Sequence, residues 1–87
     1  MTYEELREQI LNNGYENIVL FSYPSYSNAF IGISHDNRAI YDFELMVKQL
    51  CTEDNISESE AIDFIEYNTI RALPYYEDSP IIIYKLY

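Results

Sequence analysis

The chain has 87 residues, with 15 acidic and 5 basic side chains and a formal net charge of −10. Hydrophobic residues make up 48% and aromatic residues 16%, a composition that predicts one folded domain over residues 1–87 rather than a disordered chain. The charge argues against direct binding to DNA, RNA or an anionic membrane, and the apolar runs and charged N-terminus predict neither a membrane span nor a signal peptide.

The first predicted element is a helix over about residues 3–12. Thr2 and Glu5 form a capping-box pattern, in which two side chains satisfy the free amides at the start of a helix. Apolar residues follow at helical spacing, and Gly14 can adopt the left-handed conformation that ends many helices.

Three strands are predicted next. Residues 17–22 are rich in β-forming residues and apolar on both alternations, as expected for a strand inside a sheet. After a loop at residues 23–28, a second strand is predicted at residues 29–34. A tight turn at residues 35–37 then leads into a third strand at residues 38–41.

Two more helices and a last strand complete the prediction. Asp42 is a typical N-cap for a helix that runs to about Glu53. Ser57 and Glu60 form a second capping box, which opens a helix that Pro74 ends.

A final strand is expected over residues 81–86, directly after Pro80. The order is therefore α-β-β-β-α-α-β. It predicts a single small α+β domain, with a mainly antiparallel sheet of about four strands and helices packed on one face.

Few residues in the chain can support catalysis. Cys51 lies on the apolar stripe of its predicted helix and His35 lies in a turn beside Asp36, where histidines are usually solvated. One Cys and one His cannot supply a zinc site, and the two glycines cannot build a phosphate-binding loop. We therefore expect no enzymatic activity, no metal and no cofactor. A lone Cys also fits a reducing, cytoplasmic location.

The negative charge is concentrated in the second half of the chain. Residues 42–78 hold ten acids against two basic residues, a net charge of −8, whereas residues 1–41 hold five acids against two basic residues, a net charge of −3. On the predicted third helix, Glu60, Asp63 and Glu66 lie opposite the apolar stripe, and successive carboxylates rise by about 4.5 Å. Such a row can occupy a site built for successive phosphates, but it is also typical of a solvated helix face.

Tyrosines lie beside these acids. Tyr67 borders the acidic face, and Tyr75 and Tyr76 come directly before Glu77 and Asp78 in the last loop. Carboxylates mixed with exposed aromatic rings resemble a nucleic acid, which also combines anions with flat rings. The predicted partner-binding set is therefore Glu60, Asp63, Glu66, Tyr67, Tyr75, Tyr76, Glu77 and Asp78.

Other tyrosines are divided between surface and core. Tyr23 and Tyr26 fall in the first long loop, where they are candidate contacts, whereas we expect Tyr3, Tyr41 and Tyr84 to be buried. Two further expectations concern single residues. Leu45 lies opposite the apolar stripe of its helix and is a candidate for self-association. Asn68 and Arg71 are interpreted as structural residues near a helix end, with a partner contact as the alternative for Arg71.

Residues 67–75, Tyr-Asn-Thr-Ile-Arg-Ala-Leu-Pro-Tyr, resemble a stretch that recurs in a set of small uncharacterised phage and prophage proteins of low-GC Gram-positive bacteria. Residues 25–34 and 38–41 extend the resemblance, which covers roughly residues 25–86. It implies phage or mobile-element ancestry, and it implies no catalytic residue. In size and charge alone, the chain is also similar to anti-CRISPR proteins.

We therefore expect an inhibitor of anti-CRISPR type in the cytoplasm of the host bacterial cell. Its acidic, Tyr-rich surface would occupy the nucleic-acid-binding site of a basic partner, best matched by an RNA-guided CRISPR nuclease with Arg- and Lys-lined channels. The alternative is a non-catalytic adaptor or structural protein that acts through protein–protein or homodimer contacts at the Tyr-rich loops and Leu45.

Overall fold

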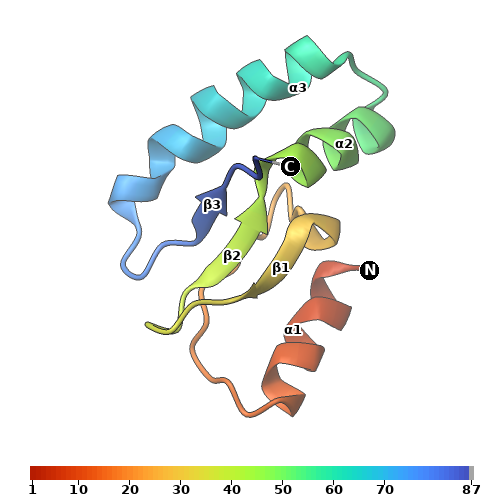
Figure 1. Ribbon diagram of the computed structural model, residues 1–87. Coiled ribbons are helices and arrows are strands. Elements are labelled where there is room, and N and C mark those ends of the chain that lie inside the picture. Colours follow the sequence, from red (N-terminus) through yellow and green to blue (C-terminus); the bar gives the residue numbers. More distant parts are fainter. Residues whose placement is uncertain (87) are drawn as a thin grey trace.

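Figure 1 shows the computed structural model of the protein, which describes residues 1–86. Three helices and a three-stranded sheet form a small α+β domain, as predicted. The helices are α1 (Tyr3–Asn12), α2 (Phe43–Asp54) and α3 (Glu58–Phe64), and the strands are β1 (Phe30–Ile33), β2 (Ala39–Asp42) and β3 (Ile81–Ile83). A 3-10 turn (Ser27–Ala29) precedes β1.

Helix α1 has the predicted bounds and capping box. The Glu5 amide donates to Thr2 Oγ1 at 3.1 Å, and the Thr2 amide donates to Glu5 Oε1 at 2.8 Å. Gly14 follows the helix at φ +88°, a left-handed conformation that glycine adopts without strain. Leu6 and Ile10 are the buried residues of the helix.

The predicted strand at residues 17–22 is wrong. These residues pair with no strand in the sheet, although Phe21 is buried in the core. The Phe21 amide donates instead to the Tyr41 hydroxyl at 3.3 Å, and the two rings lie with their centres 4.7 Å apart. Asn17 has φ 62°, so the backbone departs from an extended conformation where the strand was expected to begin.

The sheet has three strands in the order β1-β2-β3, rather than four, and it is mixed rather than mainly antiparallel. Strands β1 and β2 form an antiparallel hairpin, in which Phe30 faces Tyr41 and Ile31 is an extra residue in the ladder. Strand β3 pairs with β2 in parallel, with Ile40 facing Ile81. A parallel neighbour requires a long crossover connection, and α2 and α3 supply it.

Figure 1 shows where the helices lie around the sheet. Helix α1 lies beside β1, and α3 with its continuation runs along the β3 side of the molecule. In this view α1 therefore lies toward the β1 edge of the sheet, and α3 lies toward the β3 edge. None of the helices within residues 1–86 has the length and apolar character needed to cross a membrane.

Asp42 caps α2 as predicted, because its side chain accepts from the Leu45 amide at 3.1 Å, and Asn55 ends the helix in a left-handed conformation.

The hydrophobic core joins α2, α3 and the sheet. Tyr26 and Tyr41 are the two largest fully buried side chains of this core. Its buried members are Phe21, Tyr26, Ala29, Ala39, Tyr41, Met46, Val47, Leu50, Ala61 and Ile65.

Helix α3 opens with the predicted Ser57–Glu60 capping box but continues further than predicted. A π turn (Ile65–Thr69) and a 3-10 turn (Ile70–Tyr75) extend it, so that Pro74 lies inside the helical segment instead of ending it. We call α3 and these two turns, residues 58–75, the arm.

The π turn has a packing reason. Ala61, Ile65 and Thr69 are all buried and are spaced four apart, whereas an α-helix has 3.6 residues per turn, so such residues drift around its axis. A π turn holds more residues in each turn. It therefore keeps all three side chains on the core side of the arm.

Three single-residue expectations fail. Tyr26, expected as an exposed contact, is 1% exposed, and its hydroxyl lies 3.0 Å from Thr69 Oγ1. Tyr84, expected in the core, is 60% exposed and packs against Phe43 from outside. Leu45 is half-buried against the core, which removes it as a free self-association point.

Candidate functional site

Every residue of the predicted partner-binding set is exposed, and all of them lie on the arm or in the loop that follows it. Tyr67 and Tyr75 are 68% and 89% exposed. Eighteen residues at about 1.5 Å each make the arm about 27 Å long. Figure 1 shows it running along one side of the molecule from α2 to the loop before β3. The set therefore forms an extended row and not a compact patch.

The middle of the arm carries a shallow open groove of about 530 Å³, lined by Asp63, Glu66, Tyr67 and Arg71. The Arg71 guanidinium carbon lies 4.8 Å from the centre of the Tyr67 ring. This distance suits a cation–π interaction, which holds the ring in one orientation. Three predicted residues are thus brought together here with one basic residue.

The first acid of the row is partly engaged within the arm. Glu60 Oε1 accepts from the Ser57 amide at 3.2 Å and from the Ser57 hydroxyl at 3.0 Å. This carboxylate therefore stabilises the start of α3. Glu60 therefore has fewer free hydrogen-bond acceptor positions for a partner than Asp63 and Glu66 have.

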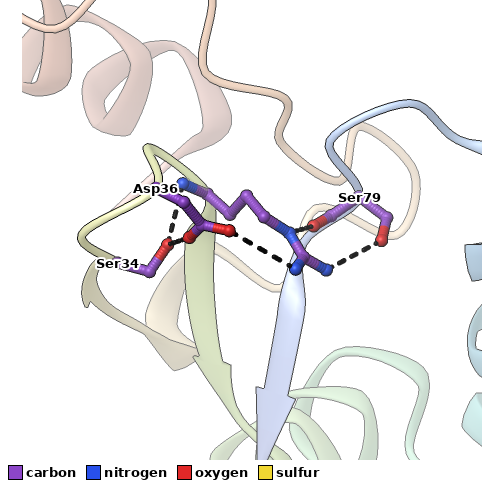
Figure 2. Close-up of polar contacts among 4 residues, drawn as sticks. Ser34, Asp36 and Ser79 are labelled. Atoms are coloured by element: carbon purple, nitrogen blue, oxygen red, sulfur yellow. Dashed lines mark hydrogen bonds and ion pairs between the residues drawn. The ribbon is translucent and has the colours of Figure 1, made fainter.

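Glu77 and Asp78 lie at the opposite end of the arm, in the loop that leads into β3. Asp78 has φ 53°, a left-handed conformation that Asp tolerates better than most residues. The Arg38 side chain holds the end of this loop, because its Nε donates to the Ser79 carbonyl at 2.7 Å and its Nη2 lies 3.2 Å from Ser79 Oγ. Figure 2 shows these contacts together with Asp36 and Ser34 of the β1–β2 turn.

A hydrogen bond also stabilises the charged form of Asp36, the acid in that turn. The Ser34 hydroxyl donates to Asp36, and this bond holds the pKa of the Asp36 carboxyl below its ordinary value. The Arg38 guanidinium lies 3.8 Å from the same carboxylate. Asp36 therefore faces Arg38 as an anion at neutral pH.

Asn68 and Arg71 have intramolecular partners. Asn68 Nδ2 donates to the Phe64 carbonyl at 3.2 Å, which satisfies a carbonyl at the point where the helix widens into the π turn. Arg71 contacts the Tyr67 ring as described above. These contacts agree with the structural roles expected for both residues, and Arg71 in addition shapes the groove.

Sequence reasoning missed the residues that position this surface. The contact between the Thr69 and Tyr26 hydroxyls depends on the π turn, which the sequence does not predict. The Arg38–Ser79 contact depends on β3 returning beside the β1–β2 turn. The spacing of four among Ala61, Ile65 and Thr69 is also that of an ordinary α-helical stripe, so it gives no signal of the π turn.

The rest of the described surface offers other features. Among residues 1–86, no group of three or more His, Cys, Asp or Glu side chains is placed to hold a metal ion. A second open groove of about 530 Å³ lies between α1 and β1, and none of its lining side chains is charged; they include Leu6, Ile10 and Ile31.

No protein-family model matches the chain, and no curated protein or solved structure matches it significantly. The functional proposal therefore rests on the chemistry of the surface.

Proposed function

We propose that this protein is a phage-encoded, non-catalytic inhibitor of anti-CRISPR type. In this proposal the arm enters the nucleic-acid-binding channel of a basic partner, with an RNA-guided CRISPR nuclease as the best candidate. Asp63 and Glu66 take the place of successive phosphates, and Tyr67 supplies a flat ring beside them. The phage origin is part of the proposal and rests on the sequence pattern of residues 67–75 alone.

The observation that carries this proposal is the exposure of all eight predicted residues along one segment that is fixed to the core. Buried Ala61, Ile65 and Thr69 anchor the arm on one side, so the acidic side is held in place before any partner binds. A preorganised surface loses little conformational entropy on binding.

The negative charge of the second half of the chain favours a partner with a basic channel. Residues 42–78 carry a net charge of −8, which attracts a cationic cleft over long distances and raises the association rate. RNA-guided nucleases hold a target duplex in positively charged channels and recognise it through its backbone. The acids of the arm lie within residues 58–66, a length comparable to a few base-pair steps of that backbone.

A binding and cleavage assay with a guide-loaded Cas9-type nuclease tests the proposal. The double variant Asp63→Lys/Glu66→Lys reverses two charges in the groove, and we expect at least about tenfold weaker binding and restored target cleavage. The matched control is Glu4→Lys/Glu8→Lys, which makes the same change in net charge at exposed positions of α1. We expect this control to keep most of the inhibition.

Two results would contradict the proposal. The first is normal cleavage at saturating concentrations of the unsubstituted protein. The second is equal loss of binding in the two double variants, because net charge alone would then account for the interaction and the arm would have no special role.

A second candidate function is supported by the groove between α1 and β1. None of its lining side chains is charged in a chain of net charge −10, and no strand within residues 1–86 pairs with the outer edge of β1. Two copies can approach there with the least electrostatic repulsion, and an edge strand is self-complementary about a two-fold axis. The protein would then act as an adaptor or structural homodimer.

Sedimentation at several protein concentrations tests this alternative. Ile31 is 42% exposed on β1, so Ile31→Lys places a charge at the groove and the strand edge, and we expect it to abolish a dimer of this kind. Such a dimer would persist at high salt, since it depends on apolar and backbone contacts. A monomer at every concentration would rule it out.

A further inference from the structure

The β1–β2 turn and the loop after the arm lie side by side, although they are about 41 residues apart in the chain. Figure 2 shows Asp36 of the turn and Ser79 of the loop on one guanidinium, with the Ser34 hydroxyl bonded to Asp36. That guanidinium belongs to Arg38, which therefore joins the sheet to the end of the acidic surface.

The geometry of this contact is specific to arginine. Arg38 Nε donates to the Ser79 carbonyl at 2.7 Å, and Nη2 lies 3.2 Å from Ser79 Oγ, so two nitrogens of the planar group bind one residue. Nη1 lies 3.8 Å from Asp36 Oδ2. A lysine has a single nitrogen and cannot reproduce this fork. The Arg38 side chain is only 32% exposed, so it is held by its surroundings as well as by these bonds.

The loop that Arg38 holds carries three of the eight residues of the proposed binding surface. Tyr76, Glu77 and Asp78 come immediately before Ser79 and are all exposed. Pro80, which follows Ser79, is buried. The loop is thus fixed at its end by a buried proline and by the Arg38 contact, and its exposed acids project from that fixed point.

We infer that Arg38 is a positioning residue for the partner interface. It holds the loop at residues 76–79 so that Glu77 and Asp78 extend the row of acids begun by the arm. This inference rests on the proposed function. It also gives a reason for a basic side chain at this point, where a positive charge by itself would weaken attraction to a cationic partner.

Whether a substitution of Arg38 strengthens or weakens binding distinguishes a positioning role from an effect of its charge. Arg38→Gln removes one positive charge and makes the protein more acidic, so electrostatics alone predicts equal or tighter binding to a basic nuclease. Loss of the positioning contact predicts weaker binding. Arg7→Gln is the matched control, because it makes the same change in charge at an exposed position of α1.

The first measurement is independent of any partner. NMR order parameters of the backbone amides report fast motion at each residue, and we expect those of residues 76–79 to fall in Arg38→Gln and to stay unchanged in Arg7→Gln. Unchanged order parameters and chemical shifts in Arg38→Gln would overturn the inference, whatever the nuclease assay shows.

The second measurement is the affinity for a guide-loaded Cas9-type nuclease. We expect at least about threefold weaker binding for Arg38→Gln, a similar loss for Arg38→Lys in spite of its unchanged charge, and equal or tighter binding for Arg7→Gln. Ser79→Ala removes one of the two bonds without any change in charge and should give a smaller loss. Ile10→Val, a core change in α1, controls for a general loss of stability.

The outcomes distinguish this inference from the function on which it rests. If Arg38→Gln and Arg7→Gln both bind equally well or more tightly, the positioning role is overturned while the proposed function stands. If the unsubstituted protein fails to bind the nuclease, the proposed function is contradicted and the role of Arg38 at that interface falls with it. Weaker binding by both glutamine variants, or by Ile10→Val to the same degree as Arg38→Gln, also overturns the inference.

Discussion

The hydroxyl of Tyr41 is the hydrogen-bond partner of the Phe21 amide, in place of a neighbouring strand. It accepts from the Phe21 amide at 3.3 Å inside the core, where the Tyr41 side chain is fully buried. Burial raises the pKa of Tyr41 to about 12, because the phenolate would be charged in a poorly solvated place. Tyr41 therefore stays neutral and hydrogen-bonded throughout the physiological range.

This burial predicts a loss of stability at alkaline pH. The folded protein holds the proton up to about pH 12, whereas the unfolded chain releases it near pH 10. The contribution of Tyr41 is therefore complete below about pH 10 and declines as the pH rises to about 12, by on the order of 3 kcal/mol. Urea unfolding between pH 9 and pH 12 measures this decline in the free energy of unfolding.

Tyr41→Phe is the diagnostic variant for this prediction. It should lower stability by about 1 kcal/mol at neutral pH, since the Phe21 amide loses its partner, and it should flatten the alkaline decline. Tyr23→Phe, at a 94% exposed site, should change neither quantity. An equally steep decline in Tyr41→Phe would show that another group is responsible.

The π turn is the element that gives the arm its two faces. It keeps Ala61, Ile65 and Thr69 toward the core, and it leaves Glu66 and Tyr67 exposed beside Asp63 and Arg71. The Tyr26 and Thr69 hydroxyls meet at this turn at 3.0 Å. Tyr26 has φ 49° although it is buried, so its backbone conformation is one that this packing must hold in place.

Thr69→Val tests the contribution of this contact. The change keeps the shape of the side chain but leaves the buried Tyr26 hydroxyl without its partner, so we expect the free energy of unfolding to fall by about 1–2 kcal/mol. Thr52→Val, at an exposed position of α2, is the matched control and should have little effect. A loss of similar size in both variants would show that the substitution itself, and not the loss of the Tyr26 hydrogen bond, lowers stability.

The elements that sequence predicts well are those with local causes. Thr2 with Glu5, Asp42, and Ser57 with Glu60 each cap a helix through residues three apart, and such contacts need no knowledge of the fold. The β1–β2 hairpin is equally local. These signals place all three helices and two of the strands.

The features that the sequence predicts wrongly depend on contacts between residues that are far apart in the chain. Residues 17–22 have the composition of a strand, but their partner is the hydroxyl of Tyr41, twenty residues beyond Phe21. The parallel direction of β3 is set by where the arm ends, and the length of the arm depends on the π turn. Composition could likewise place acids on the exposed face of the arm, but it could not show that Glu60 is engaged as a cap or that Arg38 holds the loop.

At the scale of the whole molecule, the excess of acids should affect stability. A net charge of −10 on 87 residues produces self-repulsion in the compact state, and added salt screens it. We expect the thermal midpoint to rise between about 0.05 and 0.5 M NaCl by a few degrees, which corresponds to about 1 kcal/mol for a domain of this size. Differential scanning calorimetry measures the shift, and a falling midpoint would contradict the prediction.

Salt should have the opposite effect on the proposed interface. Binding of the arm to a cationic channel should weaken steeply with ionic strength, because the same ions screen the attraction. Titration calorimetry with the guide-loaded nuclease at several NaCl concentrations measures the slope. Charge reversal at Asp63 and Glu66 should reduce that slope, and an affinity independent of salt would favour the uncharged groove between α1 and β1.

The parallel pairing of β2 and β3 also bears on how the chain folds. Ile40 and Ile81 face each other although the entire α2 and arm lie between them, so a large loop must close before this ladder can form. Closing such a loop costs entropy that only the finished contacts repay. We therefore expect the hairpin and the capped helices to form early and the docking of β3 to come late. Until that step, the arm has helical structure but no fixed direction relative to the sheet.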